Sequence, residues 1–207
     1  MIKIHTLTLG AYQTNTYIVH HAGSKTCAVI DPGYFPEKIL SKVSQLGLSV
    51  DAVLLTHGHF DHAGAVEQIV TQTGCALWMS ERDWSQFPNP VNSFFYPIAN
   101  CDFAEVSFCE QDEIIHAGGL TFHVYDTPGH TWGSVCFRCE NTLFSGDTLF
   151  AGGVGRTDLP GGNHDRLAES LQWLAEEIRE DLTVFPGHGE STTLSHEKMY
   201  NPYLRQQ

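Results

Sequence analysis

The segment 55–64 constrains this chain more than any other, because it concentrates side chains that bind metal ions. It carries His57, His59, Asp61 and His62 directly after the run 51–55, which has the composition of a buried strand. Residues two apart on an extended chain point to the same side, so His57 and His59 can hold one ion from adjacent corners. No packing rule produces such a cluster, and we therefore predict a metal centre where a strand ends.

The cluster contains more ligands than one ion takes from a short segment. A tetrahedral ion is satisfied by four ligands in total. Asp61 and His62 fall at the start of the next helix, where they can turn toward a neighbouring position. This excess favours two ions about 3.5–4 Å apart, the separation found in two-metal hydrolytic sites.

Three later strand ends share one layout, in which an apolar strand is followed by a glycine and then by a residue that can bind metal. A glycine just before a ligand lets the backbone turn sharply and approach an ion closely. We therefore predict a metal centre whose ligands come from the cluster and from these strand ends, namely His57, His59, Asp61, His62, His130, Asp147 and His188.

Asp31, in the segment 30–33, is open to two interpretations. Asp-Pro-Gly is a good turn former, but a carboxylate at a strand end can also orient a ligand histidine from behind a metal centre. We favour the orienting role. The other histidines lack a strand-end context and are expected to be surface or packing residues, except that His164, beside 161–163, is left open.

The composition indicates a globular protein and disfavours some partners. The 207 residues suffice for one buried core, so we predict a single domain over 1–207 and expect a monomer. The formal charge of −13 argues against a nucleic-acid partner, which needs clustered lysine and arginine. The chain has no long apolar run and starts with a strand-like alternation, so we expect no membrane partner and a cytoplasmic location.

The cysteines are scattered through strand-like segments, as buried small apolar residues are, and we expect no disulfide framework. Cys136 and Cys139 have the spacing of a redox or zinc pair. Their odd separation on a strand, however, places the two side chains on opposite faces. We therefore expect no shared function for them.

Hydrophobic periodicity predicts helices over 36–46, 63–73 and 165–179, and one or two helical turns around 192–199. Strands are expected over 2–9, 16–20, 27–33, 51–56, 76–79, 106–109, 113–116, 120–126, 133–138, 142–145 and 182–185. The stretch 86–105 is expected to be a long loop, either a binding wall or lid or a packed surface excursion. The pattern predicts a layered α/β protein with a site along one edge of its sheets.

Taken together, the segment 56–62, His130, the segment 146–148 and the pair 187–188 resemble the metallo-β-lactamase superfamily. The match runs in order along nearly the whole chain. The resemblance implies an α/β fold, a four-layer αββα sandwich with the metals between sheet edges. It also implies one ion on His57, His59 and His130, a second ion on Asp61, His62 and His188, and a bridging Asp147.

The segments 146–150 and 155–158 resemble the glyoxalase II branch and its small bacterial relatives. This resemblance implies hydrolysis of a glutathione thioester, such as S-D-lactoylglutathione, by a metal-bridging hydroxide. Asp61 and Asp147 are then the catalytic carboxylates, and the two divalent ions are expected to be zinc, with iron or manganese also compatible. Phe150 and Arg156 are expected to contact substrate, although Arg156 can instead pair with Asp158.

The chain also departs from that branch. Full-length members carry a helical C-terminal region with basic residues that bind glutathione, whereas 19 residues follow His188 here. A thioesterase of other specificity is therefore one alternative. A second is a persulfide dioxygenase, whose single Fe(II) would be held by His57, His130 and Asp147. A non-catalytic metal-binding protein is disfavoured, because structural sites close their coordination with four ligands.

Overall fold

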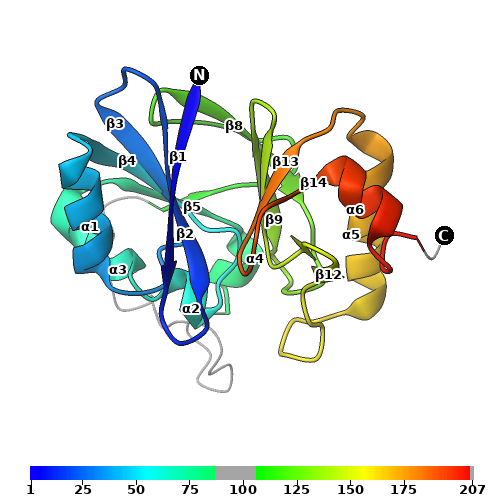
Figure 1. Ribbon diagram of the computed structural model, residues 1–207. Helices are drawn as coiled ribbons and strands as arrows, with labels where there is room; N and C mark the ends of the chain where they lie inside the picture. The colour runs from blue at the N-terminus through cyan, green and yellow to red at the C-terminus, as the bar shows by residue number, and fades with distance from the viewer. Residues whose placement is uncertain (87–105, 206–207) are drawn as a thin grey trace.

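The structure is a computed structural model that describes residues 1–86 and 106–205. Two sheets face each other, and helices cover the outer face of each (Figure 1). The first sheet has the order β1 (Ile2–Leu9), β2 (Thr14–His21), β3 (Thr26–Ile30), β4 (Ser49–Leu54), β5 (Ala76–Met79) and β6 (Val106–Phe108). The second has the order β14 (Thr192–Thr193), β13 (Thr183–Pro186), β10 (Thr142–Gly146), β9 (Val135–Cys139), β8 (Leu120–Asp126) and β7 (Ile114–Ala117).

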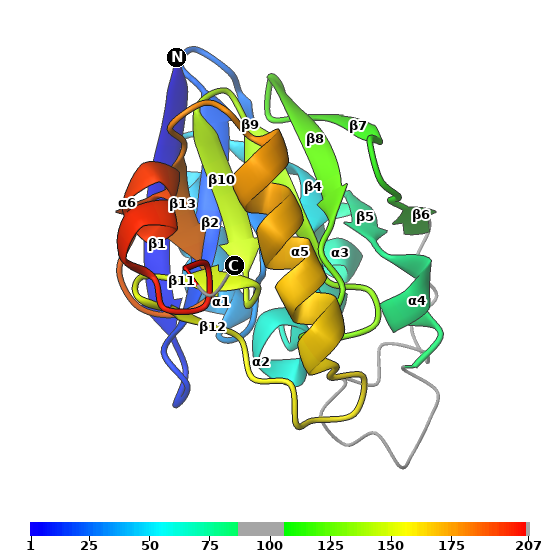
Figure 2. The same ribbon diagram turned by 90° about the vertical axis from the view of Figure 1, so that its right-hand side faces the viewer.

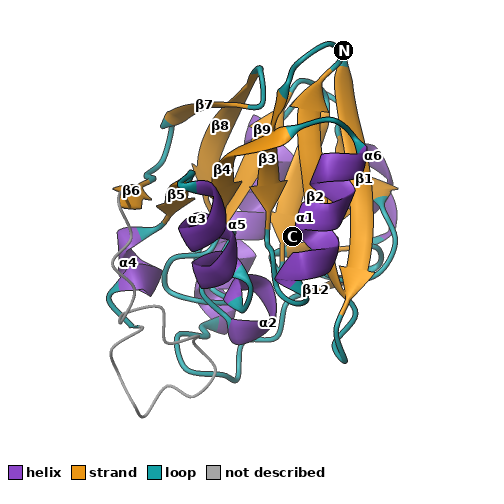
Figure 3. Cartoon of the chain, turned by 90° about the vertical axis from the view of Figure 1, so that its left-hand side faces the viewer, coloured by secondary structure: helices purple, strands orange, loops and turns teal. Residues whose placement is uncertain are grey.

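The helices fall on the two outer faces. Figure 3 shows α1 (Pro36–Gln45) and α3 (Val66–Thr73) over the first sheet, and Figure 2 shows α5 (His164–Glu177) and α6 (Leu194–Tyr200) over the second. The short helices α2 (Phe60–Ala63) and α4 (Glu81–Trp84) follow β4 and β5. This is the expected four-layer αββα sandwich, and it is confirmed.

Three apolar layers hold the sandwich together, because alternate strand residues point to opposite faces. On β2, Ile18 packs toward α1 and α3, whereas Tyr17 and Val19 pack between the sheets. On β9, Cys136 packs toward α5 and Cys139 packs between the sheets. The expectation that these two cysteines face apart is therefore confirmed, and the five cysteines in the described part of the chain are free.

Parallel pairing brings several strand ends to common edges. β3 pairs parallel with β4, so Asp31 and the histidine cluster emerge at the same edge of the first sheet. β10 pairs parallel with β13, which does the same for Asp147 and His188 in the second sheet. The backbone N–H of Val135 donates to the carbonyl of Thr56 at 2.8 Å, and this bond joins the two sheets beside these ends.

Some predicted elements differ from the observed ones. The expected helix 63–73 starts only at Val66, as α3, and Ala63 belongs to α2 instead. The backbone N–H of Ala65, between the two helices, donates to the carbonyl of Pro32 at 2.9 Å rather than within a helix. The strand expected within 27–33, which was to end in a turn, ends at Ile30, and the turn begins at Asp31 with a positive φ of 50°. The short strands β11 (Leu149–Phe150), β12 (Gly153–Val154) and β14 were not predicted. The expected loop 86–105 lies outside the described residues apart from its first position.

No helix within residues 1–86 and 106–205 combines the length and the apolar character that crossing a membrane requires.

Candidate metal centre

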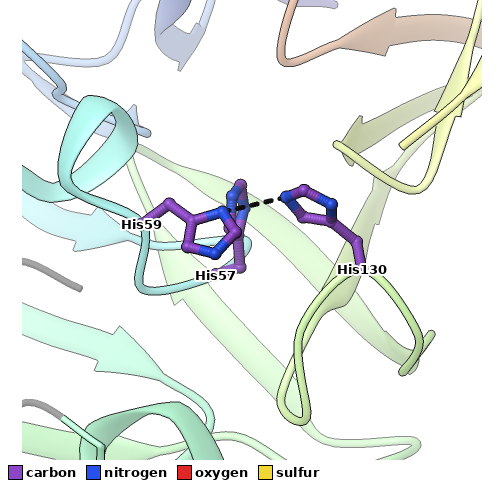
Figure 4. A group of neighbouring side chains, drawn as sticks. All are labelled: His57, His59 and His130. Carbon is purple, nitrogen blue, oxygen red and sulfur yellow. Dashed lines mark hydrogen bonds between the residues drawn. The ribbon is translucent and has the colours of Figure 1, made fainter. Parts of the chain in front are cut away.

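The first group of candidate ligands consists of His57, His59 and His130, all buried. His57 and His59 lie on the segment after β4, and His130 lies on the loop between β8 and β9. Figure 4 shows the three rings converging, with Nε2 of His130 3.0 Å from Nδ1 of His59. The three side chains can therefore face one ion.

The second group consists of Asp61, His62 and His188. The Nε2 atom of His188 lies 3.3 Å from Oδ2 of Asp61 and 3.3 Å from Nε2 of His62. Asp61 and His62 stand on the single turn of α2, and His188 follows β13. These ligand atoms also converge on one point.

Asp147 lies between the two groups. Its Oδ1 atom is 3.3 Å from Nε2 of His62, and its Oδ2 atom is 3.4 Å from Nε2 of His188 and 3.6 Å from Nε2 of His130. The structure thus brings together all the side chains that the strand-end layout singled out, and it puts Asp147 in contact with both groups.

Hydrogen bonds fix the tautomers of the histidines in a form that suits metal binding. Nδ1 of His130 donates to the carbonyl of Arg156 at 2.7 Å, and Nδ1 of His188 donates to the carbonyl of Tyr12 at 3.0 Å. Nδ1 of His62 lies 3.0 Å from Oδ2 of Asp31. Because these oxygens only accept, each Nδ1 carries a proton, and each imidazole in its neutral form presents the lone pair of Nε2 to the centre.

His57 is oriented through an intermediate hydroxyl. The hydroxyl of Thr56 donates to Oδ2 of Asp31 at 2.7 Å. Because the hydroxyl proton is used in this way, Oγ1 of Thr56 accepts a hydrogen bond from Nδ1 of His57 at 3.0 Å. Asp31 also accepts from the backbone N–H of Thr56 at 2.8 Å. The carboxylate of Asp31 therefore contacts His62 directly and His57 through Thr56, which is the geometry of an orienting residue.

The donor set fits divalent metal ions. Ligands that sit about 2.0–2.1 Å from a tetrahedral ion are roughly 3.3 Å apart, and the nitrogens and oxygens of the second group have this spacing. The buried Nε2 of His57 has no hydrogen-bond partner among the described residues. A buried imidazole nitrogen without a hydrogen-bond partner is unfavourable, and a cation at this point relieves it.

The electrostatics also favour positive charge at the centre. Burial and the neighbouring His62 and His130 hold the pKa of His57 well below its usual value, so this imidazole is neutral. Burial lowers the pKa of His188, but contacts with Asp147 and Asp61 outweigh it and raise that pKa to about 9. The two carboxylates thus attract protons when no other cation neutralises them.

Glycines let the backbone pass close to the candidate ligands and their neighbours, as the sequence indicated. A Cβ on Gly187 would collide with Oδ1 of Asp147 and would come within 2.6 Å of Cε1 of His62. Gly146 has a φ of +49°, and a Cβ there would collide with the side chain of Thr56. Both positions therefore exclude any larger residue.

A cavity of about 460 Å³ opens onto the centre. Besides candidate ligands, its walls include Tyr12, Phe60, Phe150, Val154, Arg156 and Leu159. Phe150 meets His188 edge-on, with ring centroids 6.1 Å apart. The exposed Arg156 lines this wall, and its guanidinium also donates to both carboxylate oxygens of Asp158 at 2.7 Å. Both interpretations of Arg156 therefore have a structural basis.

Several supporting residues escaped the sequence analysis. Asp83 is fully buried and accepts hydrogen bonds from the loops that carry the first group. The side chain of Asn15 donates to the carbonyls of Pro186 and Gly189, on either side of His188. An acid in the first turn of a short helix usually lies on the surface, and its helix neighbours Glu81 and Arg82 are indeed exposed, so no local signal singled out Asp83.

Comparisons with known proteins point to one family. The sequence profile of the metallo-beta-lactamase superfamily matches residues 9–188. The chain is 33% identical over 209 residues to a Haemophilus influenzae protein named hydroxyacylglutathione hydrolase GloC, and the match covers 98% of both chains. The crystal structure of TTHA1623 in a di-iron-bound form is similar with a TM-score of 0.81 and 35% identity, covering 97% of this chain and 100% of that one. ETHE1 from Myxococcus xanthus gives a TM-score of 0.81 at 26% identity, covering 97% of this chain and 83% of that one.

Proposed function

Because the chain belongs to the metallo-beta-lactamase superfamily, we propose that it is a metal-dependent thioester hydrolase. The proposed substrate is a glutathione thioester such as S-D-lactoylglutathione, which would be hydrolysed to D-lactate and glutathione. The name of the Haemophilus influenzae relative supports this substrate class. The proposal rests mainly on the position of Asp147, whose carboxylate lies within 3.6 Å of nitrogens from both ligand groups.

We assign one ion to His57, His59 and His130, and the other to Asp61, His62 and His188, with Asp147 as a ligand of both. The two metal ions, when bound, would lower the pKa of a water molecule toward neutrality and polarise the thioester carbonyl. Zinc suits these nitrogen and oxygen donors, and iron and manganese suit them as well. The di-iron form of a similar protein keeps iron among the candidates.

The protein's own groups orient the reactants. Thr14 donates to Oδ2 of Asp61 at 3.1 Å, which holds this carboxylate beside His188. Asp61 and Asp147 are the acids that would touch the attacking water, and both stay ionised, because neighbouring histidines hold their pKa values below the usual value despite burial. The two carboxylates can therefore accept hydrogen bonds from that water and keep its lone pair directed at the substrate.

The cavity walls suit an elongated acyl thioester. The aromatic rings of Tyr12 and Phe60 meet edge-on at 5.4 Å and form an apolar rim together with Phe150. Arg156 uses Nε and Nη2 for Asp158, which leaves Nη1 to bind a substrate carboxylate. Such a carboxylate is present in glutathione, so we propose that Arg156 contributes to its recognition.

The test is an assay of two reactions on protein purified without added metal. Lactoylglutathione hydrolysis is followed beside oxygen uptake with glutathione persulfide, and the metal content is measured on the same sample. The proposal predicts hydrolysis and two ions per chain. Oxygen uptake with a single iron and no hydrolysis would instead establish a persulfide dioxygenase. Hydrolysis confined to thioesters without glutathione would establish a thioesterase of other specificity.

A further inference from the structure

Asp83 is a buried carboxylate outside the candidate ligand set. It lies on α4, which begins after Ser80, whose side chain accepts a hydrogen bond from the backbone N–H of Arg82. The side chain of Asp83 is fully buried. A charged group at such a position needs hydrogen-bond donors to compensate for the loss of water.

The donors come from the two loops that carry the first ligand group. Oδ2 of Asp83 accepts from the backbone N–H of Gly58 at 2.9 Å and from the hydroxyl of Thr131 at 2.8 Å. Oδ1 accepts from the backbone N–H of Gly133 at 2.8 Å. Gly58 stands between His57 and His59, and Thr131 directly follows His130. One carboxylate thus ties together the two loops that carry the first ligand group.

The fit between α4 and the His130 loop is close. A Cβ on Gly133 would come within 2.7 Å of Oγ of Ser80 and 2.9 Å of Oδ1 of Asp83. The hydroxyl of Thr131 also lies 2.7 Å from Oγ of Ser134, which in turn accepts from the backbone N–H of Thr131 at 3.0 Å. The loop is therefore held in one conformation, and a shift of Asp83 would move the imidazole of His130 relative to those of His57 and His59.

Different elements hold the second group. In the turn before β2, the carbonyl of Tyr12 accepts a hydrogen bond from Nδ1 of His188. At the start of β2, the hydroxyl of Thr14 donates to Oδ2 of Asp61. Asn15 fixes the backbone around His188. Apart from Asp31, which contacts His62 directly and His57 through Thr56, the two ligand groups thus have separate supports, one on α4 and one at the start of β2.

We propose that Asp83 is a positioning residue that selectively sets the affinity of the ion held by His57, His59 and His130. This inference rests on the proposed function, since it assumes the two-ion centre. Exchange of Asp83 for asparagine replaces one acceptor oxygen by an N–H group, which then faces a backbone N–H or a hydroxyl donor. Loss of a partner behind a metal ligand typically weakens metal affinity 10–100-fold.

The experiment titrates the metal-stripped full chain with zinc in competition with a chromophoric chelator, and locates the lost ion by anomalous scattering from crystals. Asp83→Asn should weaken one of the two zinc dissociation constants 10–100-fold and empty the site at His57, His59 and His130. Thr131→Val removes only one donor and keeps the side-chain shape, so it should weaken the same constant by about 3–10-fold. If Asp83→Asn fails to fold, Thr131→Val decides the question.

Asp51→Asn is the matched control, because Asp51 also accepts from a backbone N–H, that of Gly118 at 2.9 Å, at the opposite end of β4. It should leave both constants within twofold of the wild type. The selective role of Asp83 would be overturned if both zinc dissociation constants stayed unchanged in Asp83→Asn and Thr131→Val. It would also be overturned if zinc binding weakened equally at both sites. A wild-type chain that binds neither zinc, iron nor manganese in the same titration would instead contradict the proposed function and remove this inference with it.

Discussion

The Oδ2 atom of Asp31 lies 3.0 Å from Nδ1 of His62, and both side chains are buried. The same oxygen accepts the hydroxyl proton of Thr56, which in turn supports His57. One carboxylate outside the candidate ligand set therefore contacts a residue of each ligand group, directly or through one hydroxyl.

Asp31→Asn should weaken metal binding without unfolding the protein. Asp31 has a φ of 50°, a conformation that asparagine also tolerates, so the turn should persist. The loss of charge should lower metal affinity about 10–100-fold and lower kcat/KM with it. The measurements are a chelator titration and the Tm of the metal-free protein. Unchanged metal affinity would show that Asp31 only forms the turn.

Gly187→Ala should abolish activity. The added methyl group would collide with Asp147 and push against His62, so the two groups could no longer converge. We expect kcat/KM to fall by about 100-fold, since a misplacement of about 1 Å in catalytic geometry can cost that much. Gly153→Ala is the matched control, because a Cβ there meets nothing within 4 Å and the glycine has no positive φ. Equal activity of the two variants would contradict the close approach at Gly187.

Arg156→Gln should raise KM for glutathione thioesters about tenfold with little change in kcat, if the guanidinium binds a substrate carboxylate. Stability should hardly change, because the pair with Asp158 is exposed and solvent screens its attraction. Asp158→Asn, which frees Arg156, should leave KM unchanged or lower it. A normal KM in Arg156→Gln would show that the arginine serves the ion pair alone.

The pH dependence of folding stability should reveal the raised pKa of Asp83. Burial raises its pKa to about 6, even though Thr131, Gly58 and Gly133 donate to it. Because the folded state holds its proton more tightly than the unfolded state, this contribution is complete below the ordinary pKa of 3.8 and is lost as the pH rises through 6. In chelator, the unfolding free energy of the wild type minus that of Asp83→Asn should fall by about 2–3 kcal/mol between pH 4 and pH 6. A flat difference would contradict the raised pKa.

Sequence reasoning reached the fold and the place of the centre, because both follow from local patterns. The apolar alternation predicts buried strands, and the glycine before His130, Asp147 and His188 marks strand ends that parallel pairing can bring together. The structure does place these side chains beside the 57–62 cluster, while their role as ligands stays a prediction.

The supporting contacts could not be predicted, because they join residues far apart in sequence. Asp83 meets Thr131 and Gly133 across 48 and 50 positions, and nothing in the local pattern of α4 distinguishes it from a surface acid. The break between α2 and α3 likewise involves a tertiary contact, the hydrogen bond from the backbone N–H of Ala65 to the carbonyl of Pro32. Such features appear only when the layers are packed.

The most direct test of the central claim is the metal content of Asp147→Ala beside that of the wild type. Because Asp147 lies within 3.6 Å of ligand nitrogens from both groups, its loss should weaken both ions together. We predict two ions per chain in the wild type, fewer than one in a folded Asp147→Ala variant, and no thioester hydrolysis by that variant. Retention of both ions by Asp147→Ala would contradict the bridging role and the two-ion centre built on it.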